Sequence, residues 1–208
     1  MPTTLPALAE LAERIGTDTA PWSLVHKRFQ SWIERPGLRE TLGTHLRELP
    51  ADEAQAVKMR SRETTTHFAW CLRDRPGEPF TFWLHEYKPQ RDWLPGYADS
   101  VHNHRYHFCT TILSGGYRHE RYDAYIDPAV DLVTTVRLTC GDFFAIGASG
   151  YLLADEFHRI PQASDGTMTF LVKSRPVATS SLSFDPATGL GHRHVPVESR
   201  LTALAERL

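Results

Sequence analysis

The first fifty residues place apolar side chains at the three- and four-residue spacing of amphipathic helices. Three runs of this kind are present: Leu5–Ile15, Trp22–Ile33 and Leu38–Leu49. The second stops before Pro36 and the third at Pro50, and proline cannot continue a helix. The pattern therefore predicts a helical N-terminal layer.

After about residue 60 the pattern changes to short runs rich in β-branched and aromatic residues. Glycine, proline and aspartate clusters separate them as turn signals. The predicted strands are Thr64–Leu72, Phe80–Tyr87, Tyr106–Leu113, Tyr117–Tyr125, Leu132–Leu138, Phe143–Ile146, Tyr151–His158 and Thr167–Lys173. Short strands without alternating helices favour a mainly β fold, an antiparallel barrel or sandwich. The aromatic residues expected to fill its core are Trp70, Phe80, Phe82, Trp83, Phe143 and Phe144.

A last amphipathic run, Val197–Leu208, predicts a short C-terminal helix. We interpret the 208 residues as one domain: a helical layer over 1–55, a barrel over 60–195 and the closing helix over 196–208. A net charge of -2 gives no indication of a nucleic-acid partner, and no apolar run is long enough to span a membrane. Three cysteines without framework spacing favour a cytoplasmic protein. Either a monomer or a homodimer is compatible with the sequence.

Histidine is concentrated in the middle of the chain, where seven of the 11 histidines lie between His67 and His158. His102 and His104 form an H-x-H pair, and alternate residues of a strand share a face. Both imidazoles can therefore converge on one metal ion. His158, at the end of a predicted strand, is the best candidate for a third ligand, and three protein ligands leave open positions for catalysis.

The surrounding motifs resemble a known family. Gly96, His102, His104 and Gly116 follow the spacing of the first conserved pattern of the cupin superfamily. Cys109 stands where most cupins have a glutamate, and H-x-H-x4-C is similar to the cysteine dioxygenase (thiol dioxygenase) family. Further similar motifs are HRI at 158–160, SRP at 174–176 and FDPATG at 184–189.

The resemblance implies a cupin-type barrel in which His102, His104 and His158 hold Fe(II) and a small substrate reacts with O2. Another divalent metal would also suit the three imidazoles. In the family's best-known member the cysteine is joined to a tyrosine, but Lys173 lies near that position here. Cys109 is therefore either a catalytic residue or a small buried one.

Other candidates come from alternation along the strands. Tyr106 shares the ligand face, so we expect it to contact bound substrate or oxygen, whereas His107 faces away. His119 and Arg121 share a face of their strand, which lines either the pocket or the solvent-exposed surface.

The arginine that holds a substrate carboxylate in the family has no clear equivalent. The candidate substrate-binding residues are His67, Arg73, Arg121 and Lys173. Glu156 is expected either to orient a ligand imidazole or to lie on an exposed edge. His192 and His194 are expected in a surface loop.

The sequence thus predicts a mononuclear non-haem iron dioxygenase that oxidises a small, thiol- or amino-acid-like substrate. Two alternatives stay open: a cupin metalloenzyme with tailoring or isomerase chemistry, and a non-catalytic small-molecule-binding protein.

Overall fold

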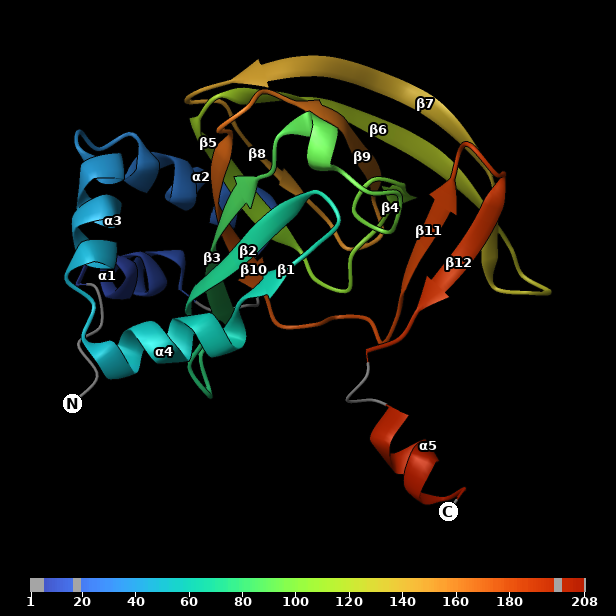
Figure 1. Cartoon of the computed structure of the whole chain (residues 1–208), viewed down its shortest axis with the longest axis horizontal. Helices are drawn as coiled ribbons and strands as arrows, with labels where there is room; N and C mark the ends of the chain where they lie inside the picture. Colours follow the sequence, from blue (N-terminus) through green and yellow to red (C-terminus); the bar gives the residue numbers. More distant parts are fainter. Residues whose placement is uncertain (1–5, 17–19, 197–199, 208) are drawn as a thin grey trace.

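The computed structural model describes residues 6–16, 20–196 and 200–207. Four helices precede the sheets and lie together on one side of them (Figure 1). Their bounds are Pro6–Ile15 (α1), Trp22–Ile33 (α2), Leu38–Arg47 (α3) and Ala51–Arg60 (α4). The first three match the predicted runs, although Leu5 is outside the described residues. Helix α4 was not predicted, because it is largely polar and Val57 is its one buried side chain among those described.

The strands form two six-stranded antiparallel sheets. Sheet A has the order β1-β2-β3-β10-β5-β8, and sheet B has the order β12-β11-β4-β9-β6-β7. The bounds in sheet A are Arg62–Glu63 (β1), His67–Arg73 (β2), Phe80–Tyr87 (β3), Phe108–Ser114 (β5), Ser149–Leu152 (β8) and Met168–Ser174 (β10). Those in sheet B are Val101–His102 (β4), Gly116–Asp127 (β6), Leu132–Ala145 (β7), Phe157–Ala163 (β9), Ser181–Asp185 (β11) and Leu190–His194 (β12). A short 3-10 helix, Gln90–Asp92, lies between β3 and β4.

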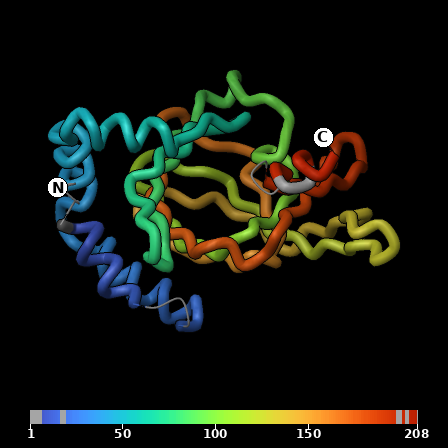
Figure 2. Tube along the Cα trace, turned by 90° about the horizontal axis from the view of Figure 1, so that it is seen from below, coloured from blue at the N-terminus to red at the C-terminus, as the bar shows by residue number. Residues whose placement is uncertain are grey.

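The predicted fold class is confirmed in its secondary structure: the chain is mainly β, with two antiparallel sheets, N-terminal helices and a short C-terminal helix. Consecutive or neighbouring strands pair antiparallel throughout the two sheets. Figure 2 shows the β6–β7 hairpin extending beyond the rest of the barrel.

Two strand boundaries differ from the prediction. The predicted strand Tyr151–His158 is two strands, β8 and β9, separated by a turn in which Glu156 accepts a hydrogen bond from the Leu153 backbone at 2.6 Å. Conversely, β7 runs through Cys140-Gly141-Asp142, which was read as a turn. A Cβ at Gly141 would lie 3.0 Å from an Arg118 nitrogen, so the glycine allows close cross-strand packing rather than a turn.

The end of the chain also differs from the prediction. His192 and His194 were expected in a surface loop, but β12 pairs with β11 over its whole length. Asp185 closes the hairpin by accepting a hydrogen bond from the Ala187 backbone at 2.8 Å. Helix α5, Leu201–Ala205, is shorter than predicted and is drawn apart from both sheets (Figure 1). Val197 and Leu208, the ends of the predicted helix, lie outside the described residues.

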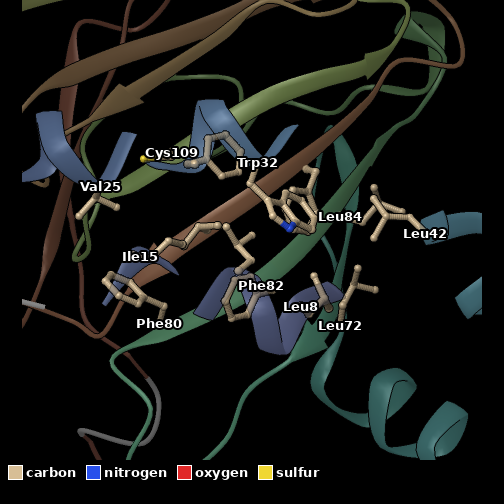
Figure 3. Packing of buried hydrophobic residues seen from close by; sticks show 14 of the residues in the cluster. Leu8, Ile15, Val25, Trp32, Leu42, Leu72, Phe80, Phe82, Leu84 and Cys109 are labelled. Carbon is tan, nitrogen blue, oxygen red and sulfur yellow. The ribbon is translucent and has the colours of Figure 1, made fainter. Parts of the chain in front are cut away.

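The largest hydrophobic core lies between sheet A and helices α1 and α2 (Figure 3). Phe29 of α2 stacks on Phe170 of β10 with ring centroids 6.1 Å apart. Phe80 and Phe82 are buried there as predicted. Phe143 and Phe144 are not core residues, with 57% and 40% of their surface exposed, because they lie on the edge strand β7.

Candidate metal centre

Three histidines converge between the two sheets. His102 on β4 pairs in register with His158 at the start of β9, and His104 follows two residues after His102. The ligand nitrogens of the three imidazoles all lie within 4.8 Å of one another. Nε2 of His104 is 2.8 Å from Nε2 of His158. The structure therefore brings together the three residues that the sequence offered as metal ligands.

Contacts behind two of these rings determine which nitrogen faces the shared point. The Ser100 carbonyl lies 2.9 Å from Nδ1 of His102, and a carbonyl only accepts, so that nitrogen carries the proton. The lone pair of His102 is then on Nε2. Nδ1 of His158 lies 2.9 Å from Nε2 of His119. If His158 donates in this contact, its own Nε2 is left free to bind a metal.

The three imidazoles are held in the neutral form that metals bind. Burial lowers the pKa of His102 to about 4, although the Ser100 carbonyl opposes this. Burial also moves the pKa of His104 and of His158 well below the ordinary value, and neighbouring histidines add to the effect. A neutral imidazole can bind a metal ion without first losing a proton.

The donor set fits a transition metal. Imidazole suits iron, zinc, copper and nickel, whereas magnesium, calcium and manganese favour carboxylate and carbonyl oxygens. Three nitrogens on one side of an ion leave positions on the other side for substrate.

The histidines form part of the wall of a cavity of about 640 Å³. This volume is in the range of small-molecule sites. The wall carries four basic side chains, whereas no aspartate or glutamate is among the described residues that line it. They are Arg62, Arg105, Arg121 and Lys173. Aromatic rings supply much of the remaining surface, from Tyr87, Tyr97, Tyr106, Phe108, Tyr117, Phe144 and Tyr151.

Five further candidates from the sequence line this cavity: His67, Tyr106, His119, Arg121 and Lys173. Tyr106 stacks on the ligand His104, with centroids 5.1 Å apart. His119 contacts His158, and Arg121 donates to Glu156 at 2.8 Å.

Glu156 does not have the role of orienting an imidazole that the sequence left open. Its carboxylate binds Arg121 and the Leu153 backbone instead. This pairing closes the turn between β8 and β9, where the sequence predicted one continuous strand.

His107 faces away from the metal site as expected, and its Nδ1 accepts a hydrogen bond from the Ala154 backbone at 2.9 Å.

Cys109 is not placed where it could act on a substrate. It alternates with Phe108 and Thr110, which line the cavity, and so faces the opposite side of β5. There it is fully buried against the helical layer (Figure 3). Burial strongly raises the pKa of its thiol, so the reactive thiolate is disfavoured. The catalytic interpretation is therefore corrected to a core residue.

Arg73 is also outside the cavity lining. Its Nε donates to Glu78 at 2.9 Å, and the pair closes the β2–β3 hairpin. A buried arginine that is already paired with a carboxylate is not free to bind a substrate anion. The prediction that Arg73 binds substrate is therefore wrong.

Two cavity residues, Arg62 and His85, were not among the substrate-binding candidates, although Arg62 is one of the arginines that flank the first predicted strand. Arg62 lies on the short strand β1, and its guanidinium carbon is 5.4 Å from the centre of the Trp83 ring. His85 shares a face of β3 with Trp83, and its Nε2 is 3.2 Å from Nζ of Lys173. Alternation along β3 could have identified His85 as a polar residue on an inward face. A two-residue strand gives no comparable signal for Arg62.

Comparison with known proteins gives limited matches. No protein-family model matches the chain, and no curated protein is similar to it at a significant level. Partial matches exist among solved structures. A point mutant of Bacillus subtilis oxalate decarboxylase is 18% identical over 60% of this chain, with a TM-score of 0.40. The Lactobacillus farciminis oxalate decarboxylase formate complex is 20% identical over 57%, with a TM-score of 0.38.

A deletion mutant of the Bacillus subtilis enzyme is 17% identical over 70% of this chain, with a TM-score of 0.41. The matched regions cover 30%, 31% and 34% of those three chains, so this chain spans about a third of each.

Among the described helices, none is both long and apolar enough to cross a membrane.

Proposed function

We propose that this protein is a metal-dependent oxidoreductase that uses Fe(II) to oxidise a small anionic organic substrate with O2. The supporting observation is the position of the three histidines in the wall of a cationic, carboxylate-free cavity. The H-x-H-x4-C motif, which resembles thiol dioxygenases, favours iron and O2 chemistry over the other metals that imidazole binds.

The charge of the cavity defines the substrate class. Three neutral imidazoles leave the full +2 charge of a divalent ion uncompensated, and the three arginines of the wall add to it. Arg121 is already paired with Glu156, but among the described residues no carboxylate forms an ion pair with Arg62 or Arg105. A substrate with a carboxylate or thiolate would supply the missing negative charge.

Arg62 is the residue best placed to bind a substrate carboxylate. Its guanidinium lies over the Trp83 ring, and its charge opposes the rise that burial causes in the pKa of Tyr106, which in turn stacks on His104. A carboxylate on Arg62 therefore lies one ring away from a ligand of the metal. This arrangement holds a short substrate with its charged end at Arg62 and its reacting end at the open positions of the ion.

The protein supplies binding, orientation and a fixed electrostatic environment. Ferrous iron, when bound, supplies the capacity to bind O2 and to exchange single electrons, which no side chain provides. His119 holds His158 in place from behind, and the aromatic wall limits the size and orientation of the substrate. The sizeable cavity allows a substrate larger than a simple amino acid.

Oxygen consumption tests this proposal. Iron-loaded protein is mixed with a panel of small thiols, amino acids and carboxylates, and O2 is followed with an electrode. We expect uptake that depends on substrate and disappears in His104→Ala. Arg62→Met is expected to raise KM about tenfold or more, since a hydrogen bond to a charged group contributes about 1.5–3 kcal/mol. His192→Ala, which changes an exposed histidine on β12, is the matched control. Substrate turnover without O2 consumption would contradict the proposal and indicate redox-neutral chemistry.

A further inference from the structure

Lys173 is the most deeply buried basic side chain of the cavity. It lies on β10, is only 3% exposed and contributes to the cavity wall. Its Nζ is 3.2 Å from Nε2 of His85, 4.3 Å from the centre of the Trp83 ring and 5.1 Å from that of Tyr106. The oxidoreductase function proposed above does not use this amine.

The groups around Lys173 do not include a counter-ion. Strand β1 contributes Arg62, β3 contributes Thr81, Trp83 and His85, β2 contributes His67 and Cys71, and the segment before β5 contributes Tyr106. Among these described neighbours one is cationic, and burial raises the pKa of the Cys71 thiol to about 11, which keeps it neutral. A buried ammonium without a carboxylate partner is costly.

The amine is therefore held in its neutral form. Burial, with the Arg62 charge as a smaller contribution, lowers the pKa of Lys173 well below its ordinary value. The rings of Trp83 and Tyr106 favour an ammonium, but by less than the cost of burying an unpaired charge. Desolvation and a neighbouring cation are the two conditions that make a lysine nucleophilic.

We propose that Lys173 is a nucleophilic amine that forms an imine with the aldehyde or ketone group of a small anionic carbonyl compound bound in the cavity. The anionic class follows from Arg62 beside it and from the absence of carboxylates among the described lining residues. The proposal is independent of the metal and of the oxidation proposed above.

The step balances without an oxidant or reductant. The Nζ lone pair attacks the carbonyl carbon, a C–N bond forms, and the π pair of the C=O bond moves to the oxygen. His85, next to Nζ, takes the two protons that the attacking nitrogen loses, one at a time, and passes each of them to the oxygen. The oxygen leaves as water, the C=N bond forms, and the net change is amine plus carbonyl to imine plus water.

Reductive trapping tests the proposal. The protein as purified is incubated at pH 7 with glyoxylate, a small anionic aldehyde, and sodium cyanoborohydride, which reduces an imine to a stable secondary amine. The chain has three other lysines, Lys27, Lys58 and Lys88, which serve as internal controls. An ordinary lysine with a pKa of about 10.4 is neutral in roughly one molecule in two thousand at pH 7. Peptide mass spectrometry is expected to find the adduct at Lys173 at least about tenfold more often than at any other lysine.

One variant and one treatment complete the experiment. Lys173→Arg keeps a long basic side chain but removes the nucleophile, and its total labelling is expected to fall to the level of the three control lysines. The unmodified protein treated with EDTA to remove divalent metal is expected to keep the labelling of Lys173, which separates this chemistry from the metal site. Labelling of Lys173 no greater than that of Lys27 and Lys58 in the unmodified protein would overturn the proposal, whether or not the variant folds.

Discussion

Each of the three central imidazoles has a neighbour that restrains its ring. Ser100 binds Nδ1 of His102, His119 binds Nδ1 of His158, and Tyr106 stacks on His104. Groups that fix the orientation of ligand rings commonly determine metal affinity as strongly as a direct contact does. We therefore assign His119 as a positioning residue that acts through His158.

Replacing His119 tests this role. His119→Ala removes the contact to Nδ1 of His158, so we expect the metal dissociation constant to rise about 10–100-fold. His119→Gln keeps a side-chain acceptor and should restore part of the affinity, which a merely space-filling role would not explain. Metal titration monitored by calorimetry gives the constants, and His192→Ala is the control. An unchanged constant in His119→Ala would exclude the positioning role.

At the scale of residues, the sequence predicts which histidines converge better than it predicts which residues line the cavity. The H-x-H spacing and His158 were sufficient for the triad, because alternate residues converge without knowledge of the whole fold. Cys109 and Arg73 were misplaced, because a motif does not say which side of a strand faces the cavity or whether a charge is already paired. Arg62 comes close to the site only through the pairing of the two-residue strand β1 with β2.

At the scale of elements, sheet B has a close backbone approach between β12 and β7. A Cβ at Gly191 would overlap the backbone of Val133, whose side chain belongs to a small core with Val101 and Phe184. Val101 directly precedes the ligand His102 on β4. Packing of the C-terminal hairpin against β7 therefore supports the strand that carries a candidate ligand.

Substitution of this glycine tests the packing. Gly191→Ala is expected to lower the free energy of unfolding by about 1–3 kcal/mol, because the backbone must shift to accommodate the methyl group. Gly150→Ala on β8 is the matched control, since no atom lies within 4 Å of its added Cβ. Its effect should be within about 0.5 kcal/mol. Urea denaturation gives both values, and equal stability of the two variants would contradict the close approach.

Errors in the predicted elements arose where tertiary pairing overrides local signals. Gly141 looked like part of a turn but lies in the long strand β7 opposite Glu120. The segment before His158 looked like continuous strand, but Glu156 turns it by binding Arg121 and the Leu153 backbone. Strand β12 was missed because its sequence lacks an apolar alternation. Its partner β11 does alternate, with Leu182 and Phe184 buried. The first three helices, whose apolar spacing is regular, were predicted close to their observed bounds.

At the scale of the whole molecule, the charge of the cavity differs from that of the chain. The protein carries a net charge of -2, yet the described cavity wall has three arginines, a lysine and no carboxylate. Composition cannot reveal this separation, because it depends on which side of each strand faces inward. The helical layer covers the outer face of sheet A and leaves the space between the sheets to the cavity.

Metal analysis of protein purified without added metal tests most directly whether His102, His104 and His158 bind a metal ion. We expect close to one transition-metal ion per chain. The metal should be lost in His158→Ala, which removes one of the three converging histidines, and kept in His192→Ala, which changes an exposed one. Circular dichroism of both variants would verify that the fold is retained. The metal site would be contradicted if the unmodified protein held no metal even after incubation with Fe(II). Equal metal content in the two variants would contradict it as well.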